Sequence, residues 1–221
     1  MTDATPRPSQ RAQAAAEARS RILAAAAECI VRDGLAQVRM ASIARTAGVS
    51  AGLLHYHFET KELLFGEVLR YSHEVSAELN RHALATGGDG PAERLAIFLD
   101  RCLPSDEQRS DEWLLWQELA LLCIRDPGLA TVGADLYEDL YATVADIVAE
   151  GVGAGVFTTG MSSRAVAETA VALTDGFGGR MLAGDPGFGI DEARAMLADA
   201  VGVLVGHDGP LPDPTRAEGA G

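Results

Sequence analysis

A short stretch beginning at residue 50 combines small residues with hydrogen-bonding side chains and rings. Small residues at 51 and 52 come first, and a His-Tyr-His run follows at 55–57. Small side chains let the N-terminal end of a helix approach base edges in a major groove, while imidazole and phenol groups can contact bases and phosphates. These residue types therefore predict contact with double-stranded DNA. The outward-facing residues are predicted to be Ala51, Gly52, Leu53, His55, Tyr56 and His57.

Two short helices around a tight Gly-Val-Ser turn are predicted to position this stretch. The first runs from about 40 to 47, where apolar residues recur at i, i+3, i+4 and i+7. Gly48 ends it, because glycine tolerates the left-handed geometry of a helix C-terminus, and Ser50 caps the second helix at 51–58. A turn this short forces the helices to cross, which predicts a helix-turn-helix at about 40–59.

At these residues the chain resembles the TetR-type family of one-component bacterial repressors. The resemblance covers about residues 18–70 and rests on the order of Ile43-Ala44, Ala47-Gly48-Val49-Ser50, Leu54-His55-Tyr56-His57-Phe58 and Lys61-Glu62-Leu63-Leu64. It implies that Tyr56 and Lys61 reach phosphates, that 51–53 approach base edges, and that Arg39 and Ser42 flank the groove. Many members have tyrosine where this chain has His55, so the resemblance does not define the contact made at this position. The predicted DNA-binding residues are Arg39, Ser42, Ser50, Ala51, Gly52, Leu53, His55, Tyr56, His57 and Lys61.

The charge of the chain is divided unevenly along its length. The 221 residues carry a net charge of −14, yet residues 1–70 hold nine Lys and Arg against seven Asp and Glu, a net charge of +2. Phosphate attraction is therefore confined to the N-terminal part, and the acidic remainder should repel DNA. An acid excess alone is also typical of a solvated protein surface, so it supports the motif without replacing it.

Three cysteines, Cys29, Cys102 and Cys123, show neither a CxxC pair nor metal-ligand spacing. We therefore predict buried thiols, no metal and no cofactor. Two alternatives stay open: a thiol-responsive regulator or activator using Cys102 or Cys123, and, more remotely, a helical enzyme. The sequence lacks a nucleophile–base grouping or a phosphate loop, and His73 and His82 do not share a helix face, so an enzyme is not predicted.

No charged region precedes an apolar run at the N-terminus, and no apolar stretch approaches the about 18 residues of a membrane span. A cytoplasmic protein without membrane contact is expected. Residues 1–9 and 207–221 are rich in Pro, Gly and polar residues and are predicted to be mobile tails. Arg7 and Arg11 are considered as an arm that enters a minor groove.

The pattern between these tails is helical throughout and predicts an all-α fold of nine helices. An N-terminal three-helix DNA-binding domain should span 10–60, followed by a ligand-binding and dimerisation domain at 61–206. Helices predicted beyond the helix-turn-helix span 61–85, a segment from Pro91, 111–125, 128–152, 163–183 and 191–206. The segment 111–125 is apolar on nearly every side, which predicts a buried helix.

From Trp113 onward the spacing of several motifs resembles the C-terminal domain of the betaine-regulator-like branch of that family. These are Trp-Leu-Leu-Trp-Gln-Glu-Leu at 113–119, Arg-Asp-Pro at 125–127, Gly-Ala-Gly-Val-Phe at 153–157 and Leu-Thr-Asp-Gly-Phe at 173–177. The resemblance implies a regulatory domain and a homodimer, without implying that choline or betaine is the ligand.

Aromatic and apolar side chains of these helices are expected to surround a regulatory cavity, although each alone would be interpreted as core. A tryptophan pair near an acid could cage a quaternary ammonium. Gln117, Glu118 and Arg180 are candidate polar anchors for an unknown small-molecule effector. The predicted ligand-binding residues are Phe98, Cys102, Trp113, Trp116, Gln117, Glu118, Tyr137, Tyr141, Phe177 and Met181.

The last two predicted helices carry apolar stripes that a second subunit should cover. Gly176, Gly178 and Gly179 within the first of them indicate either close approach of a partner or ligand, or a frayed helix end. The predicted dimer interface comprises Phe177, Met196, Leu197, Val201 and Leu204. Together these features predict a homodimeric repressor that reads palindromic operator DNA at half-sites about one helical turn apart, and an effector should change the separation of its recognition helices.

Overall fold

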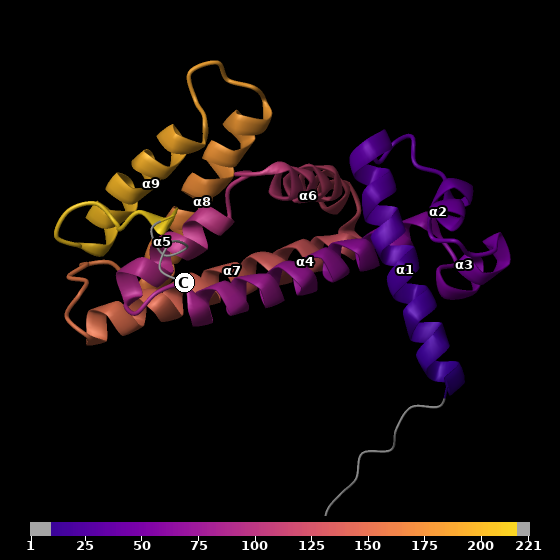
Figure 1. Ribbon diagram of the computed structural model, residues 1–221, viewed down its shortest axis with the longest axis horizontal. Helices are drawn as coiled ribbons and strands as arrows, with labels where there is room; N and C mark the ends of the chain where they lie inside the picture. Colours follow the sequence, from indigo (N-terminus) through magenta and orange to yellow (C-terminus); the bar gives the residue numbers. More distant parts are fainter. Residues whose placement is uncertain (1–9, 216–221) are drawn as a thin grey trace, which may run out of the picture.

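A computed structural model describes residues 10–215, which form nine α-helices and no β-strand. The fold class predicted from the sequence is confirmed (Figure 1). The helices are α1 (Gln10–Asp33), α2 (Met40–Thr46), α3 (Ala51–His57), α4 (Lys61–Thr86), α5 (Pro91–Arg101), α6 (Glu107–Arg125), α7 (Pro127–Gly153), α8 (Ser163–Leu182) and α9 (Ile190–Val205).

Local capping explains most of the helix boundaries. The Ser50 hydroxyl accepts the Leu53 N–H at 3.1 Å and begins α3, and Gly48, at φ +65°, makes the turn from α2. Helix α6 begins four residues earlier than predicted, because Asp106 accepts the Arg109 N–H at 2.8 Å and caps it there. One polar side chain outside the apolar pattern thus decides where this helix starts.

Helices α4 and α7 lie side by side and run in the same direction (Figure 1). Leu129 of α7 packs where Gly66 of α4 has no side chain, and further along Asp139 lies 2.9 Å from the imidazole of His73. Helices α1–α3 sit at the N-terminal ends of this pair, and α5, α8 and α9 gather at the other end.

The apolar side chains form two separate cores. The N-terminal core includes Ile22, Ile43 and Leu54 of α1–α3 together with Leu115 and Leu119 of α6. The C-terminal core is built from α5, α7, α8 and α9, with the loops that join them. Residues of α6 and of the start of α7 complete the N-terminal core. The DNA-binding unit therefore shares its core with residues that lie far beyond the predicted domain boundary at residue 60.

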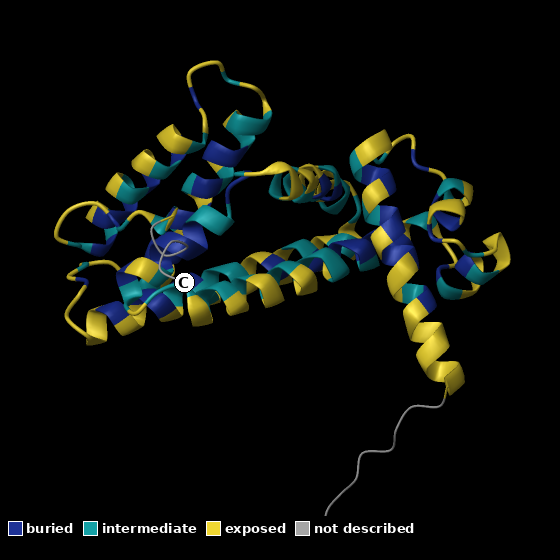
Figure 2. Cartoon of the chain, in the orientation of Figure 1, coloured by how far each residue is buried: buried dark blue, intermediate teal, exposed yellow. Residues whose placement is uncertain are grey.

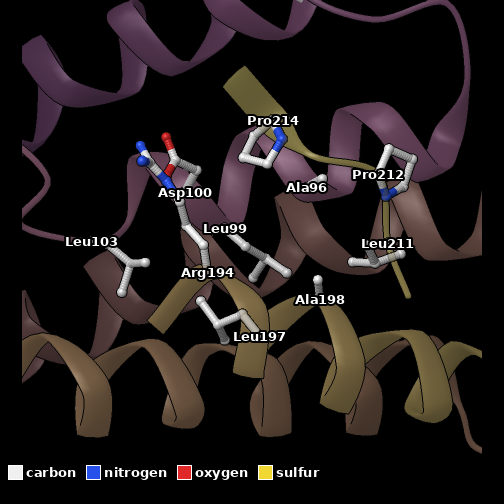
Figure 3. A pocket seen from close by; sticks show the side chains of 10 residues that line it. All are labelled: Ala96, Leu99, Asp100, Leu103, Arg194, Leu197, Ala198, Leu211, Pro212 and Pro214. Carbon is white, nitrogen blue, oxygen red and sulfur yellow. The ribbon is translucent and has the colours of Figure 1, made fainter. Parts of the chain in front are cut away.

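The segment after α9 departs from the prediction of a mobile tail. Leu211 is buried, and its N–H donates to the carbonyl of Ala198 in α9 at 3.0 Å. The prediction is therefore wrong for residues 207–215, which fold back over α5 and α9 (Figure 3). This Pro-rich segment has no helical pattern of apolar residues. It is held in place because Leu211 is buried against α5 and α9. The predictions for 1–9 and 216–221 lie outside the described residues.

Helix α6 also differs from the prediction that it is buried. Its face toward the N-terminal core holds Leu115 and Leu119, but Leu114, Leu121 and Ile124 are exposed (Figure 2). A helix that is apolar all round needs neighbours on every side, and within one subunit α6 has them on only one part of its surface. None of the described helices is long and apolar enough to cross a membrane.

Candidate DNA-binding and effector sites

The predicted DNA-reading residues of α3 lie together on an exposed surface. Ala51, Gly52 and His55 are exposed. Tyr56 is 80% exposed, the third largest value among the large hydrophobic side chains, after Val203 and Ile124. Arg39, just before α2, is also exposed, while Ser42 and Leu53 are half-buried. Small side chains near the N-terminus of α3 leave its backbone open, which suits insertion into a major groove.

His57 does not face outward as predicted. Its Nε2 atom is buried without a hydrogen-bond partner in the described structure, and the ring packs against Tyr56 and Phe58. The helical period explains the difference, because residue 57 is three positions after Leu54, the buried residue that anchors α3 in the N-terminal core. The outward surface of α3 is therefore narrower than the sequence predicted.

Lys61 is half-buried at the start of α4. Its Nζ donates to the backbone carbonyl of Leu35 at 3.1 Å and lies 5.1 Å from the centre of the Phe65 ring. An ammonium group has three donors, so one bond to Leu35 leaves two for a phosphate. The phosphate contact expected of Lys61 stays a prediction, and the bond to Leu35 is a second role.

Five of the predicted effector residues lie at the contacts of α6 and α7 with α4, α8 and the end of α5. Trp113 Nε1 donates to the Cys102 carbonyl at 3.0 Å, and the Trp113 ring fills the space beside Gly178 of α8. Trp116 meets His73 edge to face, with ring centroids 6.1 Å apart. Tyr137 and Tyr141 of α7 lie one turn apart, with ring centroids separated by 5.9 Å. Helix α6 thus brings both tryptophans to the boundary between the two cores.

The acids of this region are Asp175 and Glu112, neither of which the sequence singled out as an anchor. The Tyr137 hydroxyl donates to Asp175 at 3.0 Å. Burial raises the pKa of Asp175 and of Glu112, although Arg101 and Arg109 near Glu112 oppose its shift. Burial and the nearby Asp175 also raise the pKa of Tyr137. The site is therefore an aromatic surface beside a desolvated carboxyl group whose bonded neighbour is a phenol.

Asp175 lies within the Leu-Thr-Asp-Gly-Phe motif, so the sequence contained a signal for it. A polar residue two positions before the buried Phe177 sits on a different face of α8 from the core, toward α7. Only the packing of α7 on α8 shows that this face meets a tyrosine.

The predicted polar anchors lie elsewhere, which corrects the sequence interpretation. Gln117 is exposed, Glu118 accepts the Leu35 N–H at 3.2 Å, and Arg180 pairs with Asp185 at 2.6 Å while lying over the Phe188 ring. Glu118 follows Trp116 by two positions on α6, which turns its side chain by about 200° from that of Trp116.

Phe98 and Phe177 are buried in the C-terminal core, and Met181 packs against it. The structure therefore supports the interpretation of these three side chains as part of the hydrophobic core. Two hollows of the surface lie away from the aromatic site. One of about 470 Å³ is lined by the α4–α5 loop, α5 and residues 212–214, and a smaller one lies under Leu211 (Figure 3).

The thiols do not favour the redox alternative. Burial raises the pKa of Cys102 to about 12, and it raises the pKa of Cys123 as well. Thiolate is the reactive form, so both side chains are protonated and poorly reactive at neutral pH. Among the described residues, no three His, Cys, Asp or Glu side chains come together as a metal site.

Three residues of the predicted dimer interface are buried within the subunit itself. Leu197 and Val201 are 3% and 0% exposed, and Phe177 is also buried, so the prediction is wrong for them. The apolar side of α9 that the sequence revealed faces its own core. Met196 and Val203 lie on the other side of α9 and are 47% and 82% exposed, while Leu204 is half-buried.

Comparison with known families supports this architecture. Residues 22–68 match the family of bacterial regulatory proteins, tetR family, and residues 91–206 match the BetI-type transcriptional repressor C-terminal domain. The fold and its exposed recognition helix define a helix-turn-helix transcriptional regulator. The chain belongs to the tetR family, and its C-terminal domain is of the BetI type. These families consist of transcriptional regulators, so the enzyme alternative is set aside.

Individual relatives support the same family assignment. The HTH-type transcriptional regulator BetI of Agrobacterium fabrum is 33% identical over 100 residues, which are 44% of this chain and 47% of that protein. The chain thus aligns with about half the length of this curated relative. A transcriptional regulator from Saccharomonospora viridis, solved in complex with choline, is 31% identical with a TM-score of 0.77, covering 84% of this chain and 96% of that one. A TetR-family regulator from Rhodococcus sp. is 27% identical with a TM-score of 0.76, covering 86% and 99%.

Proposed function

We propose that this regulator is a repressor that binds palindromic operator DNA as a homodimer and is released by a small organic cation. The observation that carries the effector class is the pairing of Asp175 with Tyr137 beside Trp113. A desolvated carboxyl group next to aromatic faces suits a cation, which would supply the missing positive charge and contact the ring faces.

The DNA-binding part of the proposal rests on the exposed surface of α3. Ala51, Gly52, His55 and Tyr56 are accessible, and Arg39 adds a cation beside them. One recognition helix reads only a half-site, so operator affinity would depend on two subunits, with half-sites about one helical turn apart. We place the contact between subunits on the exposed side of α9, at Met196 and Val203, next to α8.

The effector part is supported by the choline complex of the Saccharomonospora viridis regulator, whose chain aligns with this one over most of its length. We infer a ligand of the same chemical class here, without assigning choline itself. Bound at the boundary between the two cores, a cation would favour one packing of α6 against α7 and α8. Unequal affinity for two such packings is what changes operator affinity, with a coupling of typically about 1–3 kcal/mol.

A binding assay tests both parts. Operator DNA would be selected from a random-sequence pool, and its affinity measured by fluorescence anisotropy with choline, with the uncharged isostere 3,3-dimethyl-1-butanol, and with sodium chloride at equal ionic strength. We expect a palindromic consensus and weaker DNA binding with choline than with either control. Binding that ignores choline and other quaternary ammonium ions would contradict the effector class, and a selected site without two-fold symmetry would contradict the dimeric mode of reading.

A further inference from the structure

The peptide groups of Leu35 are held from two sides. Glu118 Oε2 of α6 accepts the Leu35 N–H at 3.2 Å, and Lys61 Nζ of α4 donates to the Leu35 carbonyl at 3.1 Å. Both bonds are partly buried, and both involve an ionised side chain, so they are stronger than bonds between neutral groups. Leu35 lies in the segment between α1 and α2, directly before the helix-turn-helix.

That segment is too tight to absorb a displacement at Leu35. The N–H groups of Gln37 and Val38 donate to the Gly34 carbonyl at 3.1 and 3.2 Å, and the Val38 side chain is buried in the N-terminal core. Arg39 follows at once and is the N-cap residue directly before α2. A shift of the Leu35 peptide is therefore passed to α2, and from α2 to the recognition helix α3 that packs on it.

Glu118 lies on the same helix as the two aromatic side chains of the candidate effector site. Trp113 reaches the C-terminal core through Cys102 and Gly178, and Trp116 packs against the N-terminal core. Leu115 and Leu119, which flank Glu118 along α6, are buried in the N-terminal core. Because α6 is one rigid element, a change in its position at Trp113 also moves the carboxylate of Glu118.

We propose that Glu118 is a positioning residue that couples the Trp113–Trp116 region to the DNA-binding unit through its hydrogen bond to Leu35. This inference rests on the proposed function, because it gives the route by which an effector acts on α2 and α3. Coupling is reciprocal, so DNA bound at α3 must also change the surroundings of the tryptophans through the same bond.

The reciprocal effect can be measured without any effector, because Trp113 and Trp116 are the two tryptophans of the chain. Selected operator DNA is added to the full-length protein while tryptophan emission is recorded. We expect a spectral shift in the parent, a shift at least about fivefold smaller in Glu118→Ala at saturating DNA, and recovery in Glu118→Gln, whose amide oxygen can accept the same N–H. Glu74→Ala, which removes an exposed glutamate of α4, is the charge-matched control and should match the parent.

Amide hydrogen exchange gives a second measurement. The Leu35 N–H should exchange about tenfold faster or more in Glu118→Ala than in the parent, and in the parent its protection should change when DNA binds. The second comparison needs no variant, so it decides the matter even if Glu118→Ala fails to fold. An undiminished tryptophan shift in folded Glu118→Ala, or Leu35 protection in the parent that ignores DNA, overturns the coupling role.

Choline then separates this inference from the proposed effector. If choline weakens operator binding by the parent, the ratio of affinities without and with choline should fall toward one in Glu118→Ala, while choline binding in the absence of DNA changes less than about twofold. A parent that ignores choline contradicts the effector class proposed above. The role of Glu118 is then decided by the tryptophan and exchange measurements.

Discussion

Gly52 of α3 has open space around it, with the Ser50 hydroxyl, 4.0 Å from the place of an added Cβ, as its nearest neighbour. A side chain here would not disturb the protein's own packing. It would occupy the space that the proposed groove contact needs. A substitution at Gly52 should therefore change the contact with DNA without changing the folding of the protein. Gly52 is for this reason a direct test of the recognition surface.

We expect Gly52→Glu to abolish operator binding with little change in melting temperature, because a carboxylate at this position meets phosphates and base edges at short range. Gly153→Glu is the matched control, since Gly153 is an exposed glycine of α7 with nothing within 4 Å of an added Cβ. Anisotropy titration and thermal denaturation of both variants give the comparison. Operator affinity equal to that of the parent would show that α3 does not read the DNA.

Asp175 illustrates a residue whose environment opposes its charge. Burial raises its pKa above the about 3.9 of an unfolded chain, so the folded protein binds this proton more tightly than the unfolded one. The contribution to stability is therefore complete below the unfolded pKa and is lost as pH rises through the raised folded pKa. At neutral pH the folded protein carries the cost of a desolvated carboxylate, which a bound cation would offset.

Asp175→Asn should therefore be more stable than the parent at neutral pH, with the difference disappearing below about pH 4, where both carry an uncharged group. The amide oxygen can still accept the Tyr137 hydroxyl. Choline affinity, measured by calorimetry, should fall about tenfold or more as the charge is lost, and in the parent it should also weaken as pH falls toward the range where Asp175 is protonated. A variant that binds choline as tightly as the parent would remove Asp175 from the site.

At the scale of elements, the packing of α6 on α8 depends on one glycine. A Cβ added at Gly178 would lie 2.3 Å from the Trp113 ring, whereas Gly176 and Gly179 have nothing within 4 Å. The three glycines therefore differ. Gly178 permits the close approach of the Trp113 ring to α8, whereas Gly176 and Gly179 contact no other side chain of the subunit in this way. Only Gly178 fixes how far the tryptophan ring can approach α8.

Gly178→Ala should destabilise the protein by about 1–3 kcal/mol, because the added methyl group forces the indole or the helix to move. Gly176→Ala should instead stabilise it by up to about 1 kcal/mol, since alanine is the better helix former and meets no neighbour in the subunit. Urea denaturation followed by circular dichroism compares the two. Equal effects of both substitutions would contradict the packing of Trp113 on α8.

At the scale of the whole molecule, two cores joined by α4, α6 and α7 place the DNA-reading surface at one end and α8 and α9 at the other (Figure 1). The exposed side of α9 adds Met196 and Val203 to this far end. Two subunits joined there would hold their recognition helices apart while leaving both free to meet DNA. Any change in how α6 packs between the cores would then alter that separation.

We expect Met196→Asp combined with Val203→Asp to split the dimer without unfolding the subunit, because both side chains are exposed in the monomer and a carboxylate buried in a contact is costly. Operator affinity should fall with dimerisation. Light scattering at micromolar concentration and circular dichroism test the pair, and Leu197→Asp serves as a contrast that should unfold the protein, since Leu197 is core. A double variant that stays dimeric would place the interface elsewhere.

The sequence by itself determined the helix order, the helix-turn-helix and the family, because these depend on local signals. Gly48 and Ser50 act on their own neighbours, and the apolar period of each helix is readable within a few turns. The family-specific motifs at 43–64 likewise lie within one short segment. For the same reason the exposure of Ala51, Gly52, His55 and Tyr56 on α3 agrees with the sequence pattern, whereas His57 turns inward. Their contact with DNA stays a prediction.

Only the tertiary structure decided which apolar side chains meet each other and which meet solvent. Leu197 and Met196 are both apolar and adjacent, yet one is core and the other exposed, because the packing of α9 on the subunit selects one side of the helix. The same packing decides the hydrogen-bond partners of the two acids Glu118 and Asp175. A sequence period shows that a helix has a face, but which neighbour covers it depends on contacts between residues far apart in the chain, and these placed Glu118 on Leu35 and Asp175 on Tyr137.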